Sequence, residues 1–411
     1  MRTNESMVRR TYGLLWLSQT LSRFGDGFFF IAVSWLVFAD THSPWALGVL
    51  WFGRRAVTAM SGSLLAPLTD RVDRRRLMVA LDLARAALAA APVAAAAHGA
   101  LPPWLLYAVL LATAVCTTPY TPAAYAVLAR IVAPERLARA NALLAGGLEV
   151  MYLVGPAAGG LFIARFGAPS SMAVDAVTYA LSAALVAALP HAAGAVAAAR
   201  RLEPYGHALA VGWRMIREDG MLRLLTALNA IAGSTDMVFA VLMVPFVRVV
   251  LHGGAAAVGL LEASLSAGVI LASLLAARRG FAPGASAVGA CVAAFCLLTA
   301  GLALAPSLAW AFGLQAAAGV ATGLFQIRSQ VLFQTLVADA RLGRTLAAQS
   351  AALAASQSLS ALLAGALPLV AGVAGAFGVF GAAGALLSGG LTLARGRVAP
   401  GLATAGEDGA T

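Results

Sequence analysis

The sequence predicts an all-α integral membrane protein with twelve transmembrane helices in two halves of six. Three observations support this prediction. Of the 411 residues, 61% are apolar and 11% are charged, whereas soluble domains are nearer to half apolar and a quarter charged. Apolar stretches of about 20 residues, enough to cross a bilayer, recur along the chain. The second half of the sequence also partly repeats the first. This composition excludes a cytosolic enzyme, a disordered chain and a disulfide-stabilised secreted protein.

Twelve apolar segments are candidates for the spanning helices. The first is longer than the apolar core of a signal peptide, so we expect it to remain in the mature protein. The segments are residues 13–37, 46–68, 77–97, 104–127, 142–164, 171–189, 224–247, 256–277, 285–305, 309–333, 346–370 and 374–394.

The connections between these segments are short and leave no room for a soluble domain. The longest one lies in the middle of the chain. We therefore expect a six-helix bundle over residues 1–190, a cytoplasmic central loop over 191–223, and a second six-helix bundle with a short cytoplasmic tail over 224–411.

The basic residues predict the orientation. All 28 are arginine, and 21 of them lie in the termini, the central loop or the even-numbered connections. The odd-numbered connections hold Arg165 and Arg248. Because arginine is enriched in cytoplasmic loops, both termini are predicted to be cytoplasmic, in the cell (inner or plasma) membrane. The short arginine clusters lack interleaved aromatic residues, so nucleic acid is not expected as a partner. Five arginines remain inside the predicted spans: Arg23, Arg54, Arg55, Arg85 and Arg328.

The internal repeat relates the two halves. At an offset of 205, residues 128–142 align with residues 333–347, so that Arg136 and Arg139 meet Arg341 and Arg344. The offset is half the chain length, which predicts two six-span halves of the same direction. In such proteins the substrate site lies between the halves, near the middle of the membrane.

Two motifs resemble those of a known family. The loop after the second span, Asp70-Arg71-Val72-Asp73-Arg74-Arg75-Arg76, resembles the Gly-x-x-x-Asp-Arg-x-Gly-Arg-Arg signature of the major facilitator superfamily, with Ala66 and Asp73 in place of two glycines. The fifth span is similar to the Gly-Pro-x-x-Gly-Gly core of the superfamily's exporters and antiporters. The resemblance implies the major facilitator fold, a cytoplasmic gate at Asp70, Arg71, Arg74 and Arg75, and an exporter motif at Gly155, Pro156, Gly159 and Gly160.

Both motifs also have simpler interpretations. The loop arginines fit orienting charge alone, above all Arg71 and Arg75, and the glycines fit close helix packing. Three further stretches resemble the macrolide-efflux branch of the drug–proton antiporters, which also contains siderophore and tetracycline exporters. The arginine that many of these antiporters carry in the fourth span is absent from residues 104–127. The three stretches are Leu21-Ser22-Arg23-Phe24-Gly25-Asp26, Asp82-Leu83-Ala84-Arg85 and Leu342-Gly343-Arg344.

Acids inside the predicted spans are the candidates for proton coupling. A charged side chain at the bilayer centre costs at least about 2.5–3.5 kcal/mol on insertion scales, so it needs a wet cavity or a partner. Asp26 lies near the middle of the first span, and Asp236 takes the equivalent position in the seventh at an offset of 210. Glu149 and Glu262, nearer the span ends, are the second pair of candidates.

Arginines offer a structural alternative for these acids. Arg23 lies three residues before Asp26, close enough for a salt bridge on one helix face, and Arg54 and Arg55 of the second span are further cavity charge partners. A permanently paired Asp26 would be part of the scaffold. Asp82 with Arg85, and Asp175, lie within a turn or two of the membrane interface, and for them we favour a structural role.

Polar and aromatic side chains on helix faces predict a cavity lining. Gln326 and Gln330 share a face of the tenth span, and Asn229 precedes Asp236 on the seventh. Amides facing lipid would be costly, so these faces are expected to meet a cavity or another helix. The residues expected to line the cavity are Ser22, Phe29, Asn229, Gln326 and Gln330.

No catalytic residues, metal-ligand spacing or cofactor motif are found. The five histidines are scattered, and a phosphate-binding Gly-x-x-x-x-Gly-Lys loop requires a lysine, which the chain lacks. Transport driven by ATP hydrolysis on this chain is therefore excluded.

The sequence favours a secondary active transporter that exchanges an amphipathic organic solute, such as a drug, macrolide, tetracycline or siderophore, for protons by alternating access. The expected partners are a small-molecule substrate, protons and the lipid bilayer, and we expect a monomer. An importer or facilitator is the main alternative. A membrane sensor or assembly partner on the same fold is an alternative from another class.

Overall fold

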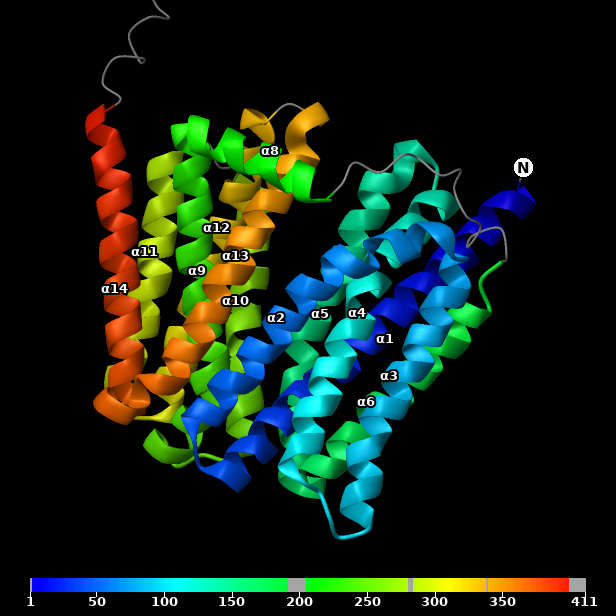
Figure 1. Ribbon diagram of the computed structural model, residues 1–411, viewed down its shortest axis with the longest axis horizontal. Helices are drawn as coiled ribbons and strands as arrows, with labels where there is room; N and C mark the ends of the chain where they lie inside the picture. The colour runs from blue at the N-terminus through cyan, green and yellow to red at the C-terminus, as the bar shows by residue number, and fades with distance from the viewer. Residues whose placement is uncertain (1, 191–204, 280–283, 338, 399–411) are drawn as a thin grey trace, which may run out of the picture.

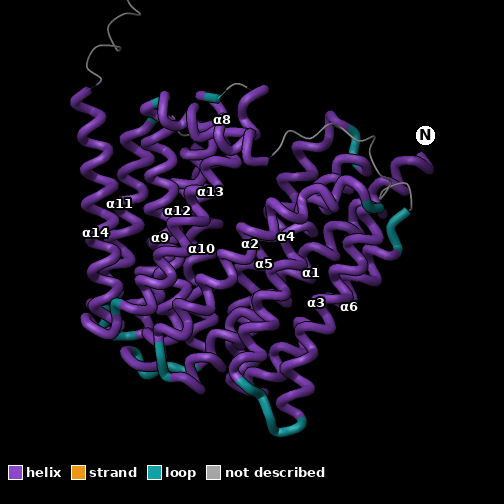
Figure 2. The backbone as a smooth tube through the Cα atoms, viewed as in Figure 1, coloured by secondary structure: helices purple, strands orange, loops and turns teal. Residues whose placement is uncertain are grey.

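The computed structural model describes residues 2–190, 205–279, 284–337 and 339–398, and the described residues form long helices joined by short loops, without a β-strand (Figures 1 and 2). The helices stand in two groups. The first contains α1 (Arg2–Thr41), α2 (Pro44–Arg71), α3 (Arg74–Ala97), α4 (Pro103–Ile131), α5 (Pro134–Phe166) and α6 (Ala168–Ala187).

The second group follows the same plan. A short helix, α8 (Tyr205–Glu218), precedes it in the described chain. The group contains α9 (Gly220–Pro245) with the π-helical turn η1 (Phe246–Val250), α10 (Ala255–Arg279), α11 (Ala285–Gly301) with the 3₁₀ turn η2 (Leu302–Leu304), α12 (Leu308–Leu336), α13 (Asp339–Ala366) and α14 (Pro368–Val398).

Helix boundaries follow local chemistry. Proline opens α2, α4 and α5, where its missing N–H removes no helical hydrogen bond. Aspartate caps two helices: Asp73 accepts the backbone N–H of Arg76 at the start of α3, and Asp219 accepts those of Met221 and Leu222 at the start of α9.

The helices agree with most of the predicted spans. Within the described residues, ten helices are long and apolar enough to cross a membrane. α2 and α13 fall outside that set because they are more polar: α2 carries Arg54 and Arg55, and α13 carries Gln349 and Gln357. Both are 28 residues long and they pack against each other inside the bundle. The arrangement is therefore all-helical and consistent with twelve spans.

The central connection is more ordered than we expected. Residues 191–223 are predicted as a loop, but the structure places helix α8 at Tyr205–Glu218 and begins α9 at Gly220. Ile216 is buried and packs with Leu209 and Trp213 in the apolar core of the second group. This spacing of three and four residues gives α8 one apolar face, a pattern that was visible in the sequence.

The two groups share a core at one end and have separate cores at the other. One apolar cluster joins both groups, with Phe29 and Leu50 from the first and Val241 and Phe377 from the second. Two further clusters belong to one group each, around Leu128 and Phe325. In Figure 1 the groups accordingly meet at the lower end and diverge toward the upper end, where α1 begins and α14 ends. The assignment of this open end to the cytoplasm stays a prediction.

Two pairs of glycines let helices of the two groups pack closely at the lower end, which we call the sealed end. Gly160 of α5 faces Gly259 of α10, and Gly365 of α13 faces Gly48 of α2. A Cβ added to Gly160 would lie 2.9 Å from the Gly259 Cα, and one added to Gly365 would lie 3.0 Å from the Gly48 Cα. The predicted offset of 205 relates Gly160 to Gly365, and an offset of 211 relates Gly48 to Gly259, so the two contacts join corresponding helices of the two halves.

An arginine adds a polar contact at the same end. The Arg248 guanidinium, on η1 of the second group, lies 4.7 Å from the ring centroid of Trp35 on α1 and 5.8 Å from that of Phe38. A cation above an aromatic face is attracted by the ring's charge distribution. Arg248 therefore helps to hold the two groups together where they meet.

Candidate functional site

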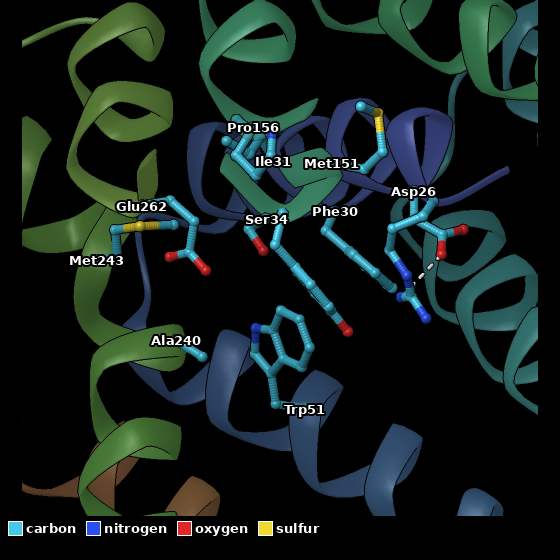
Figure 3. Close-up of a pocket in the computed structure, with 13 residues that line it drawn as sticks. Asp26, Phe30, Ile31, Ser34, Trp51, Met151, Pro156, Ala240, Met243 and Glu262 are labelled. Atoms are coloured by element: carbon cyan, nitrogen blue, oxygen red, sulfur yellow. Dashed lines mark ion pairs between the residues drawn. The ribbon is translucent and has the colours of Figure 1, made fainter. Parts of the chain in front are cut away.

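A cavity lies between the two groups of helices, above the sealed end. Its volume is about 90 Å³, and its walls come from α1, α2 and α5 of the first group and from α9 and α10 of the second. Phe30, Trp51 and Tyr152 give it an aromatic side, and Met151 and Met243 add flexible thioethers. Figure 3 shows Asp26 at one end of the cavity and Glu262 toward the other, with Phe30 and Trp51 between them. We call this space the central cavity.

Asp26 is held in a salt bridge. Its Oδ2 lies 3.0 Å from Nη1 of Arg23, and its Oδ1 accepts a hydrogen bond from the Tyr179 hydroxyl on α6. The Asp26 side chain is 13% exposed and that of Arg23 is 27% exposed, so both still reach a cavity. Arg23 also lies 4.7 Å from the Tyr152 ring centroid. The structural alternative for Asp26 is thus realised in this conformation, but the pair remains accessible.

Of the two candidate acids in the second group, Asp236 has a basic partner across the interface and Glu262 does not, among the described residues. Asp236 on α9 interacts electrostatically with Arg55 on α2, and Glu262 on α10 with Asp236. The Asp236 side chain is exposed, although helices surround it, so it faces the space between the two groups. The Arg54 guanidinium is 4.5 Å from the Phe30 ring centroid and 5.4 Å from that of Trp51. Arg54 therefore stacks on the aromatic wall of the central cavity.

A buried polar cluster lies within the first group, on the open-end side of Asp26. Arg85 donates to Asp82 Oδ1, while Ser182 and Tyr120 donate to Asp82 Oδ2 at 2.8 and 3.0 Å. The Arg85 guanidinium also lies 4.1 Å from the Tyr120 ring centroid and 4.4 Å from that of Tyr179. Asp82 and Arg85 are almost completely buried. Asp82 and Arg85, for which the sequence favours a structural role, are thus paired with each other inside the first group.

Sequence reasoning missed the partners of this cluster. Tyr179 and Ser182 lie on α6, four and seven residues after Asp175, and so share its buried face. This polar stripe was a signal that the sequence offered. Tyr120 on α4 carried no such signal, because its role depends on the packing of α4 against α3 and α1.

Two smaller groups of predicted residues line other cavities. Ser22 borders a cavity of about 50 Å³ with Gln19, Asp26, Arg85 and Tyr120 on the open-end side of the Asp26–Arg23 pair. Asn229, Gln326 and Gln330 border one of about 370 Å³ at the open end of the second group. The three amides thus face a cavity as expected, but a different one from the central cavity.

Phe29 is a correction. It was expected to line the cavity, but its side chain is 2% exposed and belongs to the apolar core shared by both groups. The adjacent Phe30 faces the central cavity instead. Neighbouring residues on a helix point about 100° apart, so a run of three phenylalanines does not show which ring faces inward.

The glycine motif of α5 packs on both sides. Gly155 and Gly159 lie against the α1 backbone near Phe24 and Phe28, while Gly160 lies against α10. Pro156 borders the central cavity. Close helix packing by this motif is therefore observed, and its role in export stays a prediction. Glu149, earlier on α5, is half-buried and interacts electrostatically with Arg23.

The predicted gate residues lie at the open end. The side chains of Asp70 and Arg71 lie outside the described part of the structure. Arg74 is buried, and Arg75 donates to the backbone carbonyl of Ala187 at the end of α6, in its own group. The next helix, α3, is capped by Asp73, which lies between the gate residues Arg71 and Arg74. A gate that closes this end stays a prediction.

The described residues contain no group of three or more His, Cys, Asp or Glu side chains arranged to hold a metal ion. The three cysteines are free thiols, half-buried or buried in helices. The site consists instead of paired charges, hydroxyl groups and an aromatic wall. Such an arrangement can bind an organic molecule and exchange protons.

Comparison with known families agrees with this architecture. The family model described as Major Facilitator Superfamily matches residues 15–284. Among curated proteins, the lysophospholipid transporter LplT of Serratia proteamaculans is 28% identical over 81% of this chain and 82% of its own length. The multidrug efflux pump Tap of Mycobacterium tuberculosis is 26% identical over 89% and 88%. Macrolide efflux protein A of Streptococcus pyogenes is 25% identical over 42% and 43%.

Solved structures show the same fold. A POT family transporter in complex with a thioalcohol-conjugated peptide superposes with a TM-score of 0.74 at 12% identity, covering 94% of this chain and 96% of that one. A bacterial homologue of the human lysosomal transporter Spinster, in an inward-facing and unoccupied conformation, gives 0.69 at 15% identity, with coverages of 95% and 97%. At these identities the likeness concerns the fold alone.

Proposed function

Because the chain belongs to the Major Facilitator Superfamily and is a multi-span membrane transporter, we propose that it exports an amphipathic organic cation in exchange for protons. One observation carries the proposal. The central cavity holds an aromatic wall with a carboxyl group at each end, Asp26 from the first group of helices and Glu262 from the second. A ligand that binds there touches both moving parts of the transporter.

The charge distribution favours a cation. Asp26 shares its charge with Arg23, whereas Glu262 has no arginine beside it among the described residues and adjoins another acid, Asp236. Phe30, Trp51 and Tyr152 would cover the apolar body of such a solute. A phosphate-bearing lipid would meet Glu262 unfavourably, which favours an organic cation over a lysophospholipid.

Proton exchange would use Asp26. A proton that binds the Asp26 carboxylate neutralises it and breaks the salt bridge with Arg23, and the loss of that proton restores the bridge. The pair borders both the central cavity and the small cavity on the open-end side, so it stands between two possible access routes. The glycine motif of α5 and the efflux relatives support export as the direction.

The test is transport by the purified protein in liposomes with an imposed pH gradient. The panel contains ethidium and tetraphenylphosphonium as organic cations, a macrolide, a tetracycline, a siderophore and a lysophospholipid. We expect gradient-driven flux of the cations. Asp26→Asn should reduce that flux to the level of empty liposomes, and Glu262→Gln should weaken cation binding about tenfold, equivalent to about 1.4 kcal/mol.

Asp40→Asn is the matched control, because Asp40 is an exposed acid on the same helix as Asp26. It should transport like the wild type. Absence of flux for every compound would contradict the proposed exporter. If Asp26→Asn still couples transport to the pH gradient, Asp26 has a structural role and does not carry the proton. Flux of the lysophospholipid alone would support transport by this protein but contradict the proposal that its substrate is an organic cation.

A further inference from the structure

Asp175 is a fully buried acid without an adequate partner. It lies on α6 with 0% of its surface exposed. Its Oδ2 has no hydrogen-bond partner, and its Oδ1 meets only the Thr178 hydroxyl, at 3.5 Å, among the described residues. That hydroxyl donates at 2.8 Å to the Asp175 backbone carbonyl, which is the better contact. The Asp175 carboxyl group is therefore almost unsatisfied.

The two helices that pack most extensively against α6, α1 and α3, each bring a charged side chain toward Asp175, but neither side chain pairs with it. From α1 the neighbour is Asp26, whose partner is Arg23, and from α3 it is Arg85, whose partner is Asp82. On α5, which also contacts α6, Glu149 interacts with Arg23, and no charged side chain of α5 is among the groups that act on Asp175 in the described structure. On α6 itself, Tyr179 donates to Asp26.

The packing against α1 is close. Gly25, directly before Asp26, leaves room for the Asp175 carboxyl group: a Cβ at position 25 would lie 2.5 Å from Asp175 Oδ1. The backbone of α1 offers no free donor there, because its N–H groups are used within the helix. Asp175 therefore adds a third carboxyl group to a region whose two arginines are already matched by Asp26 and Asp82.

An ionised carboxylate in this position would be an unpaired charge shielded from water, which proteins avoid by neutralising the group. We propose that Asp175 binds a proton and stands as a neutral carboxylic acid in this conformation, as a proton-binding site in addition to Asp26. The carboxylate takes up one proton from solution and no other group changes. The proton reaches α6 from the cavities that Asp26 borders.

The site links a proton to the position of α1. The acid stays protonated while Gly25 and Asp26 pack against α6, because this packing excludes water and places a second carboxylate beside it. A movement of α1 away from α6 would admit water and allow the proton to leave. Asp175 would thus sense the rearrangement of α1 during transport.

Infrared spectroscopy of the purified protein in lipid nanodiscs tests the proposal without any substrate. A protonated carboxyl group has a C=O stretch distinct from that of a carboxylate. We expect this band in the wild type at neutral pH, and we expect Asp175→Asn to remove one carboxyl equivalent of its intensity. Asp40→Asn, an exposed change of the same type, should leave the band intact.

Asp26→Asn provides a second measurement. It removes the negative charge beside Asp175 and frees Arg23, so the Asp175 band should disappear at a lower pH than in the wild type. A carboxylic-acid band of the same intensity in the wild type and in Asp175→Asn would overturn the proposal. Absence of this band from the wild type would also overturn it, because the Asp175 carboxylate would then be ionised and balanced by a bound cation such as Na⁺. The readout is independent of flux, so this result and the transport assay can fail separately.

Discussion

The two groups of helices resemble each other at the sealed end and differ in their polar interiors. At the seal, Gly160 with Gly259 and Gly48 with Gly365 make equivalent contacts. In the interior, the repeat-related acids Asp26 and Asp236 have different surroundings. Asp26 is paired within its own group by Arg23 and Tyr179, whereas Asp236 is open and meets Arg55 from the other group.

The two halves of the repeat therefore share a backbone plan but differ in the polar groups of their interiors. The first group carries a dense buried network of acids, arginines and tyrosines, which under the proposed function would hold and pass protons. The second group presents amides, the exposed acid Asp236 and the half-buried acid Glu262, which under the proposed function would contact the solute.

The largest expected effect concerns the network of the first group. Arg85→Gln removes the partner of the fully buried Asp82, and an unpaired buried charge costs about 3–5 kcal/mol in stability. Thermal unfolding in detergent should show a strongly lowered midpoint. The double variant Asp82→Asn with Arg85→Gln should recover a large part of it, since neither charge then remains. A single variant as stable as the wild type would remove the contrast between the two interiors.

The next effect tests the likeness of the seals. Gly160→Ala and Gly365→Ala each place a Cβ against the opposing backbone, and overpacking of this kind costs about 1–3 kcal/mol. Both should shift the transporter away from the conformation closed at this end, measured by the distance between spin labels across the open end. The two shifts should be similar. Gly146→Ala is the control, because a Cβ there meets no atom within 4 Å. A response to one variant alone would show that the seals are not equivalent.

The smallest effect lies in the second group. Asn229 donates to Ser329 Oγ at 2.9 Å and to the Leu225 carbonyl, and Asn229→Ala should cost about 1 kcal/mol in the free energy of unfolding. Gln330→Ala in the same cavity is the control, because the Gln330 side chain is exposed and should change stability little. A loss as large as that of Arg85→Gln would mean that the second group depends equally on its polar contacts.

The sequence predicted the helical fold well and the site unevenly. Long apolar runs and arginine-rich connections are local signals, so the spanning helices followed from them. Asp26, its partner Arg23 and the Asp82–Arg85 pair also followed, because residues three apart share a helix face. The arrangement of Asp175, Tyr179 and Tyr120 around them did not, since it depends on how α1, α3, α4 and α6 meet. Phe29 was misplaced because the choice between it and Phe30 is decided by helix rotation.

By itself, the sequence determined that this chain is a membrane protein of long helices with an internal repeat and a few charges inside its spans. Composition and periodicity suffice for that, because the bilayer penalises every exposed polar group along each helix separately. Tertiary structure decided how these charges are satisfied beyond their own helix. It added the Tyr179 hydroxyl to the Arg23–Asp26 pair and the Ser182 and Tyr120 hydroxyls to the Asp82–Arg85 pair. It also left Asp236 exposed and buried Asp175 without a partner among the described residues. A charge is stabilised by the groups that packing brings within reach, and the order of residues along one helix does not specify them.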